Sequence, residues 1–196
     1  MILYDCDHIR VVQRMLGSGM QKFWKFTFTV GISAIAVIAF VAATKQDFSP
    51  FVDEQGNIEL AEDVRTDWSH LGSWGLKDGM HDVYTQPESV AAYLKSGKFQ
   101  DGTVLVKEVR GHNSGVKTTG EAQWSGDIVQ WFVMVKDSEN RFPDNPLWGD
   151  GWGWALFKPD EPSKQLATSY TADCMACHIP AASTDRVYIE AYPTLR

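Results

Sequence analysis

The feature that most constrains this chain is a Cys-x-x-Cys-His motif near its C-terminal end, CMACH at Cys174 to His178. Two thiols at this spacing can add across the two vinyl groups of one haem, and the histidine that follows is then placed to ligate the iron. We therefore predict one covalently attached haem c, held through Cys174 and Cys177, with His178 as the proximal iron ligand. The rest of the domain must then provide a pocket around this group.

Two other uses of paired cysteines fit this sequence less well. A zinc site would need a second pair of ligands at suitable spacing, and the one remaining cysteine, Cys6, lies near the start of the chain. A redox-active pair would be expected in a thioredoxin-like βαβ setting, which the pattern of predicted elements does not show.

An uncharged apolar stretch, 26–44 (FTFTVGISAIAVIAFVAAT), follows Lys22 and Lys25. As a helix it would span about 28 Å, close to the roughly 30 Å of a bilayer core. Its denser part, 30–43, has the length of a signal-peptide core and ends on small residues that suit cleavage. We predict that 26–44 is either a cleaved signal peptide or a membrane anchor.

This leader divides the chain into three parts. Residues 1–25 would stay in the cytoplasm, and 45–196 would form a periplasmic haem c domain. Met20 followed by the apolar run makes a complete signal peptide by itself, so 1–19 is either an over-extended start or a real cytoplasmic tail.

The charge of the exported part bears on its partners. After Lys45 the chain holds 13 basic and 23 acidic residues, which gives this part a net charge of −10. The net charge of the whole chain is −7. A domain without a basic surface is a poor candidate for contacts with phosphate backbones. We therefore expect no nucleic-acid partner, and membrane contact only through the leader.

Residue patterns predict the elements of the exported domain. Strands are expected at 103–109, 128–136, 152–157 and 186–192, and short helices at 87–96 and 171–178. Because strands outnumber helices and the connections are short, we predict an α+β fold, mainly an antiparallel sheet with a few helices packed against it.

For some of these elements the pattern also predicts which side chains face the core. In 128–136 the odd positions from Val129 to Val135 form an apolar face toward the core, whereas Phe132 and Met134 lie on the other, mixed face. In 87–96 a stripe of Val90, Tyr93 and Leu94 should be buried. For the second helix, Thr171 or Asp173 is placed to cap the N-terminus.

The sixth position of the iron distinguishes an electron carrier from a ligand-binding cytochrome. A carrier closes it with a methionine or a second histidine. The candidates, none in a recognisable ligand motif, are His70, Met80, His81, His112 and Met134. His112 stands in GHNSG, which is typical of a solvent loop. An open, five-coordinate iron is the alternative.

Several stretches between Leu60 and Arg196, one of which contains the motif, resemble, in the same order, those of cytochrome P-460 and its close relative cytochrome c′-beta. The stretches are 84–107 (YTQPESVAAYLKSGKFQDGTVLVK), 135–138 (VKDS), 141–144 (RFPD), 145–157 (NPLWGDGWGWALF), 172–178 (ADCMACH) and 184–196 (TDRVYIEAYPTLR). The resemblance implies a homodimeric, mainly antiparallel-β haem c protein of the periplasm that exchanges electrons with a redox partner protein. It also implies an open distal side opposite His178.

In the P-460 enzymes a lysine is bonded to the porphyrin rim, and the matching position here is Lys107. The strand pattern permits this role, because Lys107 alternates with the apolar Leu105 and Val109. A lysine on an apolar face is unusual unless its amine has a partner. The alternative is a side chain that extends from a strand end to solvent.

The P-460 enzymes that oxidise hydroxylamine also carry a distal glutamate, and Phe132 stands at the matching position. Phenylalanine cannot accept a proton. It would make the distal side apolar, as in the cytochrome c′-beta proteins, which bind diatomic gases. Plain core packing would explain Phe132 equally well.

Three functions are consistent with these residues. The first is an oxidoreductase acting on hydroxylamine or NO, with Lys107 bonded to the haem. The second is a protein that binds NO or CO without turnover, behind Phe132. The third is an electron carrier with a closed sixth site.

Overall fold

The computed structural model describes residues 48–77 and 79–196. The predicted cytoplasmic segment and leader, 1–25 and 26–44, lie outside these residues, as does Cys6. Within the described part of the chain, no helix is long and apolar enough to cross a membrane.

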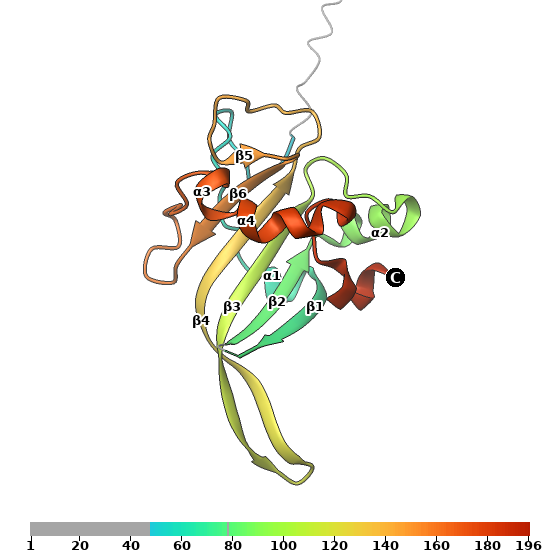
Figure 1. Ribbon diagram of the computed structural model, residues 1–196, viewed down its shortest axis with the longest axis vertical. Coiled ribbons are helices and arrows are strands. Elements are labelled where there is room, and N and C mark those ends of the chain that lie inside the picture. Colours follow the sequence, from blue (N-terminus) through green and yellow to red (C-terminus); the bar gives the residue numbers. More distant parts are fainter. Residues whose placement is uncertain (1–47, 78) are drawn as a thin grey trace, which may run out of the picture. The chain divides into compact units, whose positions relative to one another are not determined.

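A six-stranded sheet forms the centre of the fold (Figure 1), in the order β1-β2-β3-β4-β6-β5. All neighbouring strands are antiparallel. The strands are β1 (Ser69–Leu76), β2 (Gly79–Thr85), β3 (Val104–Lys117), β4 (Gly120–Lys136), β5 (Trp148–Gly149) and β6 (Trp152–Phe157). The predicted α+β class, with a mainly antiparallel sheet, is confirmed.

Strand β6 has the predicted bounds, whereas β3 and β4 are longer than predicted. They continue as a hairpin beyond the ends of their neighbours (Figure 1), with paired residues out to Lys117 and Gly120. The prediction of a loop at His112 was therefore wrong, because this residue lies on β3, although its side chain is exposed as expected.

Two apolar clusters lie on the two sides of the sheet, as the alternation of side chains along a strand requires. The first combines strand residues with the N-terminal residues Ile58, Ala61 and Val64; its strand members are Tyr84, Val104, Val106, Val133, Val135, Ala155 and Phe157. The second combines Val83, Leu105, Met134 and Trp154 with C-terminal residues; these are Tyr170, Cys174, Val187, Tyr192 and Leu195. The C-terminal segment therefore covers the second face (Figure 1).

Val133 and Val135 are buried as predicted, but Val129 is 53% exposed. It lies beyond the last residue of β4 that pairs with β6, which is Trp131. The apolar alternation therefore continues past the part of the sheet that is covered.

Helix α2 (Pro87–Ser96) also has the predicted bounds, and Gly97 ends it in the left-handed region at φ 69°. Val90 and Tyr93 pack against the second cluster as expected. Leu94 does not, since it is 54% exposed. A shorter helix, α1 (Val64–Asp67), precedes the sheet.

The C-terminal segment consists of single turns. These are α3 (Tyr170–Asp173), α4 (Met175–His178) and the 3₁₀ turns η1 (Ile179–Thr184), η2 (Ile189–Ala191) and η3 (Pro193–Leu195). The single helix predicted over 171–178 is broken at Cys174, whose backbone is not helical (φ −126°).

The helix cap and the last strand were also predicted wrongly. Ser169 caps α3, its hydroxyl accepting from the Ala172 amide (3.1 Å), whereas the Asp173 carboxylate accepts from the Thr168 amide. The strand expected at 186–192 is absent from the described structure, because turn hydrogen bonds such as Tyr192 N–H to Ile189 carbonyl (3.0 Å) fold these residues onto the sheet face.

Candidate functional site

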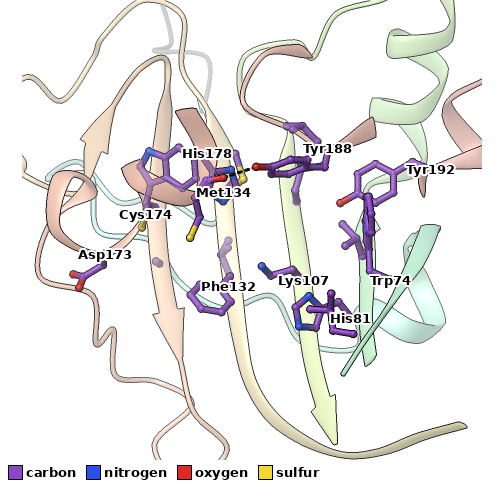
Figure 2. Close-up of a pocket in the computed structure, with 18 residues that line it drawn as sticks. Trp74, His81, Lys107, Phe132, Met134, Asp173, Cys174, His178, Tyr188 and Tyr192 are labelled. Carbon is purple, nitrogen blue, oxygen red and sulfur yellow. Dashed lines mark hydrogen bonds between the residues drawn. The ribbon is translucent and has the colours of Figure 1, made fainter. Parts of the chain in front are cut away.

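A cavity of about 350 Å³ lies between the second sheet face and the C-terminal segment (Figure 2). It is lined by Cys174, Cys177 and His178 from the C-terminal side, and by Lys107 and Phe132 from the sheet. The fold thus brings together around one space all five residues that the sequence singled out. Most of the remaining wall is apolar or aromatic, including Trp74, Val83, Leu105, Met134, Trp154, Val187, Tyr188 and Tyr192.

His178 is held in a defined orientation on the wall of the cavity. Its Nδ1 lies 2.7 Å from the carbonyl oxygen of Arg186, and its ring meets the Trp154 ring edge-on, with centroids 4.5 Å apart. Because a carbonyl can only accept, Nδ1 carries the proton and Nε2 keeps its lone pair. Burial lowers the pKa of His178 below its ordinary value, which favours the neutral ring that an iron requires.

The carbonyl that orients His178 belongs to an unusual turn. Asp185 and Arg186 both have positive φ, 57° and 67°, in the region that non-glycine residues rarely adopt. Lys136 Nζ binds Asp185 Oδ1 (2.9 Å), and Trp152 Nε1 donates to the Asp185 carbonyl (2.9 Å). These contacts from β4 and β6 hold the turn against its strain and so fix the acceptor for His178.

A second anchor supports the same turn. The Arg186 guanidinium lies 2.6 Å from Asp150 Oδ2, and the Tyr170 hydroxyl donates to the same oxygen at 2.6 Å. Sequence reasoning did not identify this arrangement, because its functional atom is a backbone carbonyl and carries no residue signature.

We expect Asp185→Ala to lower the free energy of unfolding by about 1–3 kcal/mol more than Asp63→Ala. Asp63 is a matched control, because it has a similar backbone (φ 51°) but its side chain makes no cap hydrogen bond. Only the Asp185 change leaves the buried Lys136 amine without its carboxylate. Urea denaturation of both variants measures the difference, and equal losses would show that Lys136 does not stabilise the turn.

The two cysteines of the motif are free thiols. Cys174 is buried and Cys177 is exposed, yet both line the cavity. Burial, with a smaller effect of Asp173, raises the pKa of the Cys174 thiol to about 11. Both sulfurs are therefore available on the same wall as His178.

Lys107 and Phe132 are paired neighbours on β3 and β4, and they form part of the opposite wall. The Lys107 amine lies 4.5 Å from the centre of the Phe132 ring. Burial lowers the pKa of Lys107. The Lys107 side chain therefore stays within the cavity region rather than extending to solvent. Phe132 lines the cavity and also packs against Lys107.

Of the candidates for a sixth iron ligand, His81 and Met134 line the cavity. His70 is bound outside it, with Nε2 3.1 Å from the Ser73 hydroxyl, and His112 is on the exposed hairpin. Met80 also has no part in the cavity wall.

These residues fit a haem. The cavity has a volume in the range that holds cofactor-sized ligands, and its walls are mainly apolar. Two thiols and a neutral imidazole with a free Nε2 share one wall, which is the donor set that a haem c needs.

The comparison with known families agrees with this donor set. The family model for cytochrome P460 matches residues 61–189, a range that contains the whole sheet, α2 and the Cys-x-x-Cys-His motif. No curated protein is significantly similar to the chain. The chain belongs to the cytochrome P460 family, and it is a haem-binding cytochrome.

Proposed function

We propose that this cytochrome carries one haem c, attached through Cys174 and Cys177, and that its iron binds small nitrogen species such as NO and hydroxylamine in the periplasm. The observation that carries the proposal is the Arg186–His178 hydrogen bond. This bond occupies Nδ1 and leaves Nε2 of His178 to bind iron, on the same cavity wall as both thiols. The strands form the opposite wall of the cavity.

A bound haem iron would supply ligand binding and electron exchange. The residues of this chain would supply the surroundings. His178 would hold the proximal side in a fixed tautomer, and Trp154 would fix the plane of its ring. Phe132 and Met134 would exclude water from the sheet side.

A specific observation favours turnover of hydroxylamine as a second candidate function. The Lys107 amine is within the cavity region and its pKa is lowered, so the neutral, nucleophilic form is more accessible than in solvent. A bond from this amine to the porphyrin rim, as the P-460 enzymes have, would replace one N–H and one rim C–H bond, with both hydrogens lost to an external two-electron oxidant, and it would distort and tune the haem. Phe132 favours the alternative, NO or CO binding without turnover, because it offers no proton acceptor.

The first experiment is an absorption spectrum of the 45–196 domain, oxidised and reduced, with and without NO, together with the intact mass under denaturing conditions. Covalent haem and a spectrum that responds to NO are expected. A haem lost on denaturation would contradict the attachment through Cys174 and Cys177. A six-coordinate spectrum indifferent to NO would instead support an electron carrier.

We expect Lys107→Ala to keep the haem attached but to change its absorption spectrum, with a mass that no longer lacks the hydrogens displaced by a cross-link. Lys117→Ala is the matched control, because Lys117 is on the same strand and its amine likewise lies over an aromatic ring, Trp124 at 4.4 Å. It lies on the hairpin outside the cavity and should leave the spectrum unchanged. An unchanged Lys107→Ala spectrum would mean that no cross-link exists.

Two further parts of the proposal concern partners. We propose that the protein forms a homodimer and exchanges electrons with a redox partner protein, and the exposed hairpin residues Val116 and Trp124 would be available for contacts. Size-exclusion chromatography with light scattering would measure the mass of the particle and so test the homodimer.

A further inference from the structure

The cavity wall holds a second histidine, His81, to which neither the motif nor the family comparison assigns a role. His81 lies on β2 and lines the cavity from the sheet. Its cross-strand partner on β3 is Val109, which places it diagonally beside Lys107 on the same face. Figure 2 shows His81 beside the Lys107 side chain, whose amine points toward Phe132.

His81 and His178 approach the cavity from different layers. His178 comes from α4 in the covering segment, whereas His81 comes from the sheet, near Lys107 and Phe132. With His178 as the proximal ligand, His81 would therefore lie on the side where an external ligand would bind.

Of the other polar groups that line the cavity, Asp173 and Tyr188 already have hydrogen-bond partners. The Asp173 carboxylate accepts from Thr168 and Ser169, and the Tyr188 hydroxyl donates to the Cys177 carbonyl (2.7 Å). Within the described residues, neither ring nitrogen of His81 has a hydrogen-bond partner. Its lone pair is thus available to a molecule in the cavity.

The charge state of His81 suits an acceptor. Burial, and next the positive charge of Lys107, lower the pKa of His81, while Asp82 has a smaller opposing effect. The lowered pKa favours the neutral ring, which has one nitrogen that donates and one that accepts.

We propose that His81 is a specificity-determining residue that accepts a hydrogen bond from an N–H or O–H group of the bound ligand. This inference rests on the proposed function and narrows it, because hydroxylamine has such groups and NO and CO have none. His81 would supply the acceptor that Phe132 does not.

The test compares the equilibrium affinities of the ferric protein for hydroxylamine and of the ferrous protein for CO, without an external electron acceptor. The variants are His81→Leu and His81→Gln, with His112→Leu as the matched control on the exposed hairpin. We expect His81→Leu to weaken hydroxylamine binding about five- to tenfold, the effect of one lost hydrogen bond, with CO affinity unchanged. His81→Gln should lose less, since its amide oxygen also accepts.

Several results would overturn the inference while leaving the proposed function in place. Unchanged hydroxylamine affinity would show that His81 does not contact the ligand. Equal weakening of both ligands would show that His81 only shapes the cavity. A six-coordinate wild-type spectrum that becomes five-coordinate in His81→Leu would make His81 an iron ligand. By contrast, wild-type protein that binds neither NO, CO nor hydroxylamine would refute the proposed function itself.

Discussion

Replacing His178 with alanine is expected to abolish native axial ligation while the haem stays attached through Cys174 and Cys177. The cavity wall that holds His178 offers no second imidazole, because the other cavity histidine, His81, lies on the sheet side. The ferrous absorption and resonance Raman spectra should therefore lose the signature of an iron–histidine bond. We expect imidazole added in solution to restore it, since the deletion leaves a space of that shape.

The control for this variant is His112→Ala, on the exposed hairpin, which should leave every band in place. Native axial ligation retained in His178→Ala would refute the assignment of the proximal ligand. A weaker effect is expected from changes to the Asp185–Arg186 turn, because these alter the orientation of His178 rather than remove its ring.

Replacing Trp152 with alanine should cause the largest loss of stability, about 3–5 kcal/mol in the free energy of unfolding. Trp152 is only 1% exposed, and its ring contacts Phe99 edge-on with centroids 5.5 Å apart. Its Nε1 also donates to the Asp185 carbonyl. The alanine variant would lose both the buried aromatic volume and a hydrogen bond that supports the turn beside His178.

Chemical denaturation of two further variants separates these contributions. Trp124→Ala removes the same side chain from the hairpin, where it is 41% exposed, and should cost under about 1 kcal/mol. Trp152→Phe keeps most of the apolar volume but loses the Nε1 donor, so its loss should be intermediate. Equal losses for Trp152→Ala and Trp124→Ala would contradict the assignment of Trp152 to the core.

The parts of the fold predicted well have strong local signals. Strand β6 and helix α2 had the correct bounds, because apolar or aromatic residues fill the first, and Pro87 and Gly97 mark the ends of the second. The hairpin beyond β3 and β4 was missed, since its glycines and polar residues resemble a loop, and only strand-to-strand pairing extends it.

Strands β1 and β2 were not predicted, and their glycines give the physical reason. A β-carbon at Gly72 would collide with the carbonyl oxygen of Ala191, and one at Gly79 with that of Arg110. Close approach of other backbone segments requires glycine there, although glycine weakens the local strand pattern. The strand wrongly expected at 186–192 is the converse case, in which packing onto the sheet overrides an apolar alternation.

The residues of the candidate site also divide into those with a local sequence signal and those placed only by the fold. The motif indicated Cys174, Cys177 and His178, and the resemblance added Lys107 and Phe132; the structure places all five around one cavity. His81 was only one of five candidates for a sixth ligand, because nothing in its sequence surroundings distinguishes it. Its place on the cavity wall depends on the pairing of β2 with β3, which no local pattern encodes.

The order of elements along the chain has a consequence for biosynthesis. All six strands of the described structure precede the Cys-x-x-Cys-His motif, and the two helices on either side of Cys174 are four residues each, too short to be stable alone. A chain emerging from its N-terminal end can therefore pair its strands before the motif arrives. Haem would then bind to a sheet whose strands are already paired. The segment after Ser169, which covers the second face of the sheet, would become ordered last.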